Sequence, residues 1–208
     1  MVFRLNDELI FPNPTYAEED GLLAVGGDLS IERLLLAYQQ GIFPWYSEGE
    51  PILWYAPKER FVLFPKNLKV SKSLQNKISR GRFTITQNQA FEQVIDQCAQ
   101  VKRTDQDGTW ITNEMRTAYI ALHQKGIAQS VEIWEGEELV GGLYGVVVGR
   151  VFCGESMFHT VADASKIALT YLVKTANYQL IDCQVYTDHL ASLGAEFISM
   201  KAYQSFLK

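Results

Sequence analysis

The 208-residue sequence lacks any apolar run near the roughly 20 residues that a membrane-spanning helix needs. Its first residues, Met1–Pro14, also lack the basic segment followed by an apolar segment that marks a signal peptide. We therefore expect a cytoplasmic protein without a membrane partner. Hydrophobic residues make up 47% of the chain, which is enough for a sizeable core in one larger domain or in a small domain plus a main one.

Cysteine and histidine are scarce, with three of each. The cysteines Cys98, Cys153 and Cys183 are far apart and form no CxxC pair, so neither a disulfide framework nor a zinc site is predicted. The histidines show no recognisable ligand spacing or triad. Catalysis by the Cys183 thiol would need a histidine that the fold brings from elsewhere, and we consider it the less favoured mechanism.

The net charge of −5 argues against nucleic-acid binding by the whole surface. The stretch Lys66–Arg82 is nevertheless basic. Such a stretch is usually the solvated face of a helix, and the alternative is contact with the phosphates of a nucleic acid. The residues that would make such contacts are Lys72, Lys77, Arg80 and Arg82.

Residues 1–60 are rich in turn formers and aromatic residues, with one clear helix over Ile31–Tyr38 between Ser30 as cap and Gly41 as stop. From about residue 60 the pattern becomes regular. We therefore predict a small loop-rich domain over 1–60 and a main domain over 61–208.

The main domain shows alternating strand and helix periodicity. Gly126 stops one helix, and Thr112 and Asp163 are the expected caps of two. The predicted helices are Ala90–Cys98, Asn113–Lys125, Ala164–Thr175, His189–Leu193 and Lys201–Leu207, and the predicted strands are Phe83–Thr86, Ser130–Trp134, Leu139–Val148, Arg150–Gly154 and Leu180–Val185.

This order of elements resembles the N-acetyltransferase-like acyltransferase fold, an α+β fold with a mixed sheet. In that fold the fourth and fifth strands splay apart and leave a cleft for an acyl donor and an amine. An enzyme that uses acyl-coenzyme A would carry a basic, glycine-rich pyrophosphate loop between the fourth strand and its helix. The corresponding segment, Phe152–Lys166, has a single glycine and several bulky apolar residues, which disfavours coenzyme A and favours a donor whose acyl part is hydrophobic.

Several long motifs resemble the leucyl/phenylalanyl-tRNA-protein transferase family along nearly the whole chain. The resemblance implies a transfer of Leu or Phe, and less well Met, from aminoacyl-tRNA to the N-terminal Arg or Lys of proteins. This transfer would mark those proteins for degradation by the N-end rule pathway, without a metal or organic cofactor. The motifs are GLLAVGGDLS, GIFPWYS, GTWIT, LVGGLYGV, FCGESMF, DASK, LIDCQV and HLASLGAE.

Asp182 and Gln184 are the candidate catalytic residues. Two residues apart on a strand, they are expected on the same face, with Cys183 on the other. The resemblance implies that Gln184 contacts the attacking amine and that Asp182 polarises this contact and helps to remove the proton. The alternative is a strand-end acid and amide that only bind loop amides.

Glu155 is expected just after the third hairpin strand, where the cleft should open. A carboxylate there can pair with a cationic acceptor side chain or an α-ammonium group. The alternative is an internal salt bridge.

The donor is expected to occupy an apolar pocket and an aromatic stack. Each of these residues has ordinary core packing as its alternative, and the resemblance assigns them to substrate binding. The pocket residues are Leu143, Phe152, Met157, Leu169, Leu172 and Ile181, and the candidates for stacking on the terminal adenine are Tyr38, Trp45 and Trp110.

Two rival functions remain at this point. A small-molecule N-acyltransferase that uses acyl-coenzyme A is disfavoured by the missing pyrophosphate loop. A binding module for RNA ends on a decayed transferase scaffold is disfavoured because Glu155, Asp182 and Gln184 are all present. We expect a monomer whose partners are the acceptor end of aminoacyl-tRNA and a protein substrate.

Overall fold

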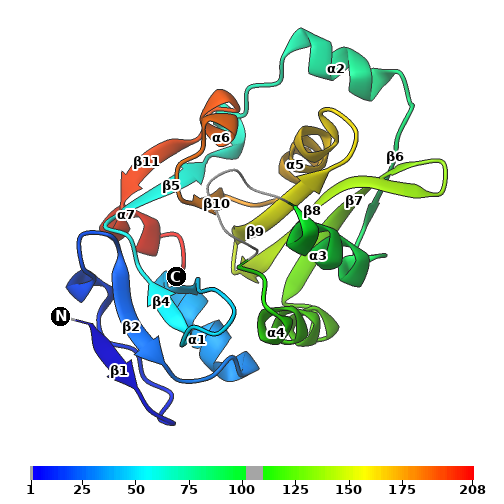
Figure 1. The fold of residues 1–208 in the computed structure, drawn as a ribbon. Helices are drawn as coiled ribbons and strands as arrows, with labels where there is room; N and C mark the ends of the chain where they lie inside the picture. The colour runs from blue at the N-terminus through cyan, green and yellow to red at the C-terminus, as the bar shows by residue number, and fades with distance from the viewer. Residues whose placement is uncertain (1, 102–109) are drawn as a thin grey trace.

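The computed structural model describes residues 2–101 and 110–208, which form two sheets packed around a shared core (Figure 1). The smaller sheet has the strand order β1-β2-β4-β3. The predicted first helix is confirmed as α1, with the Ser30 side chain capping its start and Gly41 in the left-handed conformation at its end. The elements of this N-terminal part are β1 (Phe3–Leu5), β2 (Leu22–Gly26), α1 (Ile31–Gln40), β3 (Phe43–Pro44) and β4 (Leu53–Tyr55).

The larger sheet has seven strands in the order β11-β5-β10-β9-β8-β7-β6. All neighbours pair antiparallel except β9 and β10, which are parallel. The strands are β5 (Glu59–Leu63), β6 (Thr84–Gln87), β7 (Ala128–Glu135), β8 (Glu138–Val148), β9 (Val151–His159), β10 (Leu180–Gln184) and β11 (Glu196–Ser199), and the helices of this part are α2 (Lys72–Ser79), α3 (Phe91–Gln100), α4 (Asn113–Gln124), α5 (Ala164–Thr175), α6 (Asp188–Ser192) and α7 (Met200–Gln204).

Successive side chains of a strand point to opposite faces of its sheet. The two faces of the large sheet therefore contribute to different apolar clusters. Tyr144 and Cys153 belong to the cluster that contains α3, α4 and the N-terminal part. Their strand neighbours Leu143 and Phe152 belong to the cluster under α5. The mixed α+β architecture predicted from the sequence is therefore present.

The basic stretch contains the helix α2, in agreement with its reading as a helix face. The sequence analysis needs correction elsewhere, because it did not predict β5 and β11, which extend the sheet. Asp163 precedes α5 but makes no side-chain capping bond, because it lies in the left-handed conformation and its carboxylate pairs with Lys77 and Lys166. The boundary at residue 60 stays a prediction, although β5, which crosses it, lies inside the large sheet.

The parallel strands β9 and β10 separate at a defined point. Their pairing runs from Leu180 opposite Val151 to Asp182 opposite Cys153 and then stops. Beyond it, β9 continues along β8 to His159, whereas β10 ends. The expected splay is therefore present. In the described residues, no helix has the length and apolar character that crossing a membrane requires.

Candidate active site

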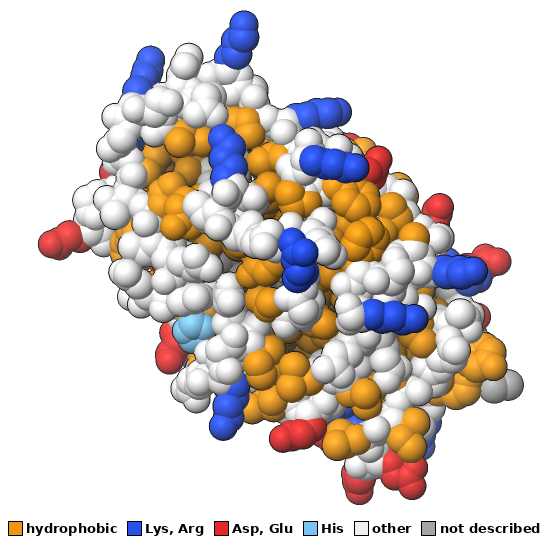
Figure 2. Space-filling view, turned by 180° about the vertical axis from the view of Figure 1, so that it is seen from behind, with side chains coloured by type: hydrophobic (Ala, Val, Ile, Leu, Met, Phe, Trp, Pro, Cys, Tyr) orange, Lys and Arg blue, Asp and Glu red, His pale blue; other side chains and the backbone are white. Residues whose placement is uncertain are grey.

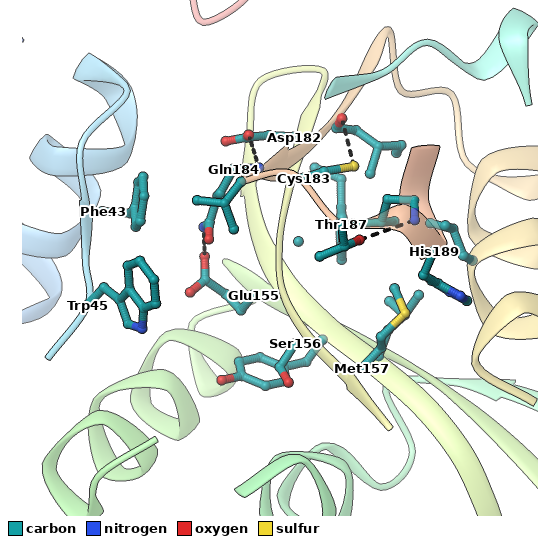
Figure 3. Close-up of a pocket in the computed structure, with 18 of the residues that line it drawn as sticks. Phe43, Trp45, Glu155, Ser156, Met157, Asp182, Cys183, Gln184, Thr187 and His189 are labelled. Carbon is teal, nitrogen blue, oxygen red and sulfur yellow. Dashed lines mark hydrogen bonds between the residues drawn. The ribbon is translucent and has the colours of Figure 1, made fainter. Parts of the chain in front are cut away.

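A cavity of about 540 Å³ opens where β9 and β10 separate. In Figure 3, Phe43 and Trp45 of the N-terminal part flank one side of it, and Met157 and His189 lie on the other. The cavity is lined by Phe43, Pro44, Trp45, Trp110, Leu143, Tyr144, Phe152, Gly154, Glu155, Ser156, Met157, Leu169, Ile181, Asp182, Cys183, Gln184, Val185, Tyr186, Thr187, His189 and Leu190.

Asp182 is a fully buried carboxylate that accepts four hydrogen bonds. Arg60 donates two of them, from Nε at 2.9 Å and from a terminal nitrogen at 2.7 Å. The hydroxyl of Tyr203 donates the third at 2.7 Å and the backbone N–H of Gln184 the fourth at 2.8 Å. Because a carboxylate has about four acceptor positions, this group has none left for a substrate proton.

Arg60 is equally buried and lies between two aromatic rings. Its guanidinium carbon is 4.6 Å from the ring centre of Phe43 and 4.7 Å from that of Tyr203. Burial alone would lower the pKa of Arg60, but the adjacent Asp182 carboxylate raises it above its usual value, so the cation is retained. The sequence analysis missed this residue, although an arginine beside the apolar run Phe61–Phe64 was a signal.

Gln184 does not follow the regular strand pleat. It has a φ of 62°, and the register with β5 shifts between Asp182 and Gln184. The same-face argument for this pair is therefore wrong, and Cys183, expected on the other face, also lines the cavity. What brings the two residues together is the bond from the Gln184 N–H to Asp182, which holds the left-handed backbone.

Glu155 lies within β9 rather than after it, since the strand runs on to His159. Its Oε1 accepts a 2.7 Å hydrogen bond from Nε2 of Gln184, and its Oε2 accepts one of 2.9 Å from the Tyr119 hydroxyl. Burial is the main cause that raises the pKa of Glu155 to about 7, and the nearby Asp182 adds to it. The alternative considered for Glu155, an internal salt bridge, is absent among the described residues, where the groups around its oxygens are the neutral side chains of Gln184, Tyr119 and Tyr38.

A bulge between β8 and β9 determines the orientation of Glu155. Tyr144 pairs with Ser156 and Gly145 with Gly154, so Glu155 is the extra residue. A Cβ on Gly145 would lie 2.2 Å from the Cys153 carbonyl oxygen. Only glycine fits there.

Gly145→Ala is therefore expected to lower the free energy of unfolding by about 1–3 kcal/mol, because the bulge must shift to admit the methyl group. Urea denaturation would measure the loss. The matched control is Gly149→Ala in the β8–β9 turn, where the added Cβ meets no atom within 4 Å but the positive φ of 56° costs some strain. A Gly145→Ala protein no less stable than this control would contradict the tight bulge.

Five of the six residues predicted for the apolar pocket lie on the cavity wall, and their role toward the donor stays a prediction. Leu143, Phe152, Met157, Leu169 and Ile181 line the cavity. Leu172 does not, because it points into the core under α5 and is only 1% exposed. Sequence reasoning did not name four further residues of the cavity wall, Phe43 on β3, Thr187 just before α6, and His189 and Leu190 on α6. A signal was present, because Phe43 lies in the motif GIFPWYS and the two lining residues of α6 lie in HLASLGAE.

Two of the three aromatic candidates for adenine stacking line the cavity, namely Trp45 and Trp110. The expectation for Tyr38 is wrong. Its ring is buried in the core and its hydroxyl shares a hydrogen bond with that of Tyr119. Tyr38 thus supports Glu155 through Tyr119 and has no open ring face for a base. Gly108 and Thr109 of the GTWIT motif lie outside the described residues.

The four basic candidates are outside the cavity. Lys77 pairs with Asp163, and Arg82 pairs with Glu135 through two 2.7 Å bonds. Lys72 and Arg80 are exposed on α2 and just after it, without an ion pair to the described residues. On the face in Figure 2, Lys and Arg side chains spread over the upper part, where acidic side chains are few.

A mixed sheet with two splayed parallel strands, and a cavity with polar and apolar halves at the splay, define an acyltransferase of the N-acetyltransferase-like type. Residues 62–208 match the family model "Leucyl/phenylalanyl-tRNA protein transferase", and residues 27–58 match the model of its N-terminal domain. The chain belongs to this family, and it is an enzyme of the transferase class.

Full-length relatives agree with this assignment. A leucyl/phenylalanyl-tRNA–protein transferase of Flavobacterium johnsoniae is 53% identical, covering 100% of this chain and 99% of the relative. One of Syntrophobacter fumaroxidans is 57% identical, covering 99% and 89%. Among solved structures, a GCN5-related N-acetyltransferase from Kribbella flavida has 12% identity and a TM-score of 0.41 over 77% of this chain and 58% of that one.

Proposed function

We propose that this enzyme transfers Leu or Phe, and less well Met, from the acceptor end of aminoacyl-tRNA to proteins that begin with Arg or Lys. The transfer would mark those proteins for degradation by the N-end rule pathway. The observation that carries the proposal is a single cavity in which an apolar half adjoins Gln184 and Glu155. The donor, charged tRNA, places the reaction in the cytoplasm, and we expect the enzyme to act as a monomer.

The transfer reaction requires little chemical catalysis from the protein. An aminoacyl-tRNA ester is already activated, and an α-amine with a pKa of about 7.7–8.0 is partly neutral at cytoplasmic pH. No covalent intermediate is needed. The enzyme has to align amine and ester and to accept the proton that the amine loses.

Glu155 is the better proton acceptor of the two carboxylates. All acceptor positions of Asp182 are occupied by Arg60, Tyr203 and the Gln184 backbone. Glu155 accepts hydrogen bonds from Tyr119 and Gln184 and also interacts with the Tyr38 hydroxyl, so fewer of its about four acceptor positions are filled than in Asp182 and room is left for an α-ammonium group. In this mechanism Gln184 contacts the amine, Glu155 binds the α-ammonium group and takes its proton, and Asp182 positions Gln184. The amine nitrogen then forms the amide bond to the ester carbon while the ester bond to the tRNA breaks. The second proton that the nitrogen loses goes to the 3′ oxygen of the released tRNA, and Glu155 returns its own proton to solvent.

The donor fits the remaining walls of the cavity. Leu143, Met157 and Ile181 offer an apolar pocket for its side chain. Trp45 and Trp110 offer ring faces for the terminal adenine, an interaction worth about 1–3 kcal/mol per base. The acceptor-stem phosphates would contact the basic residues on and after α2.

Lys72 and Arg80 provide a test of this phosphate contact. We expect the double change Lys72→Ala and Arg80→Ala to reduce the slope of log K against log salt for tRNA by about 2, because each basic residue releases about one counterion. Filter binding at several salt concentrations measures the slope. Changing Lys174, an exposed lysine on α5 that binds Gln75, gives a matched control. An unchanged slope in the double variant would remove this surface from the proposal.

The function itself is tested by the transfer of labelled Leu or Phe from charged tRNA to paired proteins that differ only in an N-terminal Arg or Met. Transfer to the Arg protein alone is the expected result. No transfer from any charged tRNA would contradict the proposal and favour a binding module for RNA ends, and thermal stabilisation by coenzyme A would favour the acyl-coenzyme A enzyme.

A further inference from the structure

The rim of the cavity carries an exposed aromatic surface next to Gln184. Tyr186, which lines the cavity, is 52% exposed, and Phe197 on the edge strand β11 is 50% exposed. Single exposed aromatic rings are common, but two adjacent ones beside a cavity form a contiguous apolar patch, which is the kind of surface that marks a binding site. We define the rim as Tyr186, Phe197 and Asp188.

The rim residues contact one another and the buried ring of Phe61. The ring of Phe61, which is buried beneath it, lies 5.2 Å from Tyr186 and 4.8 Å from Phe197, measured between ring centres. Tyr186 and Phe197 are nearly parallel, with 14° between their planes. The Tyr186 hydroxyl donates a 2.7 Å hydrogen bond to the exposed carboxylate of Asp188. An aromatic face and a carboxylate thus lie side by side next to the cavity, and Tyr186 is the one of the three rim residues that lines it.

An aromatic ring beside a carboxylate is suited to binding a cation. An Arg or Lys side chain is attracted to the face of an aromatic ring, and a carboxylate beside the ring can neutralise its charge. A phosphate group would instead be repelled by Asp188, and the four basic residues proposed for phosphate contact do not line the cavity. The rim therefore fits a cationic polypeptide better than a nucleic acid.

We propose that Tyr186 and Asp188 bind the cationic side chain of the acceptor's N-terminal residue, while its α-amine reaches Gln184 and Glu155. The inference rests on the proposed function and adds the residues that select the acceptor. The closeness of the rim to the candidate catalytic residues supports this assignment, because Tyr186 follows Gln184 by two residues and both line the same cavity. An acceptor that enters over the rim places its first side chain on the Tyr186 ring.

The test uses acceptor peptides that begin with Arg or with citrulline, which has the shape of Arg but no charge. Tyr186→Ala and Asp188→Asn are each expected to raise the KM for the Arg peptide about 5–20-fold, a change in keeping with one cation–π contact or one exposed ion pair. The kcat at saturating peptide and the KM for aminoacyl-tRNA should change less than about twofold. Tyr186→Phe, which keeps the ring, should retain most of the affinity.

Two controls match the rim residues in type and exposure. Tyr16→Ala removes a 63% exposed ring in the N-terminal part, and Glu137→Gln neutralises an exposed carboxylate in the β7–β8 turn. Neither lines the cavity. Both should behave as the unchanged protein, and circular dichroism would confirm that all variants fold.

The outcomes separate the two proposals. If Tyr186→Ala and Asp188→Asn leave the KM for the Arg peptide unchanged while the unchanged protein is active in transfer, the proposed role of the rim in acceptor binding is contradicted. The proposed function is not affected by that result. If the variants instead raise the KM for aminoacyl-tRNA, the rim binds a nucleobase, and its proposed role in acceptor binding is again contradicted. If the unchanged protein transfers nothing, calorimetry with the Arg peptide still decides, because Tyr186-dependent binding would support the rim while the proposed function fails.

Discussion

Arg60→Ala and Asp182→Ala are each expected to lower the free energy of unfolding by about 3–5 kcal/mol. Either change leaves one buried charge without its partner, since both side chains are fully buried and hydrogen-bonded to each other. Urea denaturation measures the loss from the shift in midpoint at constant slope. Asp182→Ala is expected to lose transfer activity chiefly because Gln184 loses the acceptor that holds its backbone.

The double change Arg60→Met and Asp182→Leu is the matched control. It removes both charges together and fills the space with apolar groups, so we expect it to be more stable than either single variant. Circular dichroism and the same denaturation series compare the three. If the Asp182→Ala protein has wild-type stability but no transfer activity, Asp182 rather than Glu155 would be the group that removes the proton.

Glu155→Gln is expected to lower kcat for transfer by about 10²–10⁴-fold, the usual contribution of a general base. The amide keeps the shape of Glu155 and can still bind Tyr119, but it cannot take a proton from the acceptor amine. Single-turnover transfer with saturating donor and acceptor measures the effect on kcat directly. The KM for the acceptor should also rise more than the KM for the donor, because Glu155 binds the α-ammonium group.

The pH dependence follows from the pKa of Glu155, which is raised from 4.5 to about 7. Transfer by the unchanged enzyme should fall as pH drops below about 7, where Glu155 becomes protonated. The folded protein binds this proton more tightly than the unfolded chain does. The stabilising effect of protonated Glu155 is therefore complete below pH 4.5 and is lost as pH rises to about 7.

A stability series from pH 5 to pH 8 distinguishes Glu155→Gln from a damaged fold. Since glutamine does not ionise, the variant should gain stability relative to the unchanged protein as pH rises through this range. Ser156→Ala, a change at the next position of β9 on the cavity wall, provides the comparison for transfer. A variant that keeps wild-type kcat and the same pH profile would exclude Glu155 as the base.

Local patterns were sufficient to place most elements of the fold. Apolar spacing, together with Ser30 and Thr112 as caps, predicted α1 and α4 nearly to the residue, because capping bonds involve neighbours in the chain. Asp163 shows the limit. Its side chain was expected to cap α5, but it pairs with Lys77 from α2, a partner 86 residues away that no local pattern reveals.

The sequence by itself determined the acyltransferase-like order of strands and helices, the missing pyrophosphate loop and the apolar residues around the cleft. Only the tertiary structure decided the roles of the polar residues. The acceptor positions of Asp182 are filled by Arg60 and Tyr203, which are distant in the sequence, and by the Gln184 backbone. The carboxylate of Glu155 interacts with neutral side chains alone among the described residues, and its burial raises its pKa to about 7. The physical reason is that burial and hydrogen-bond saturation depend on which segments pack together, and proton affinity follows from both.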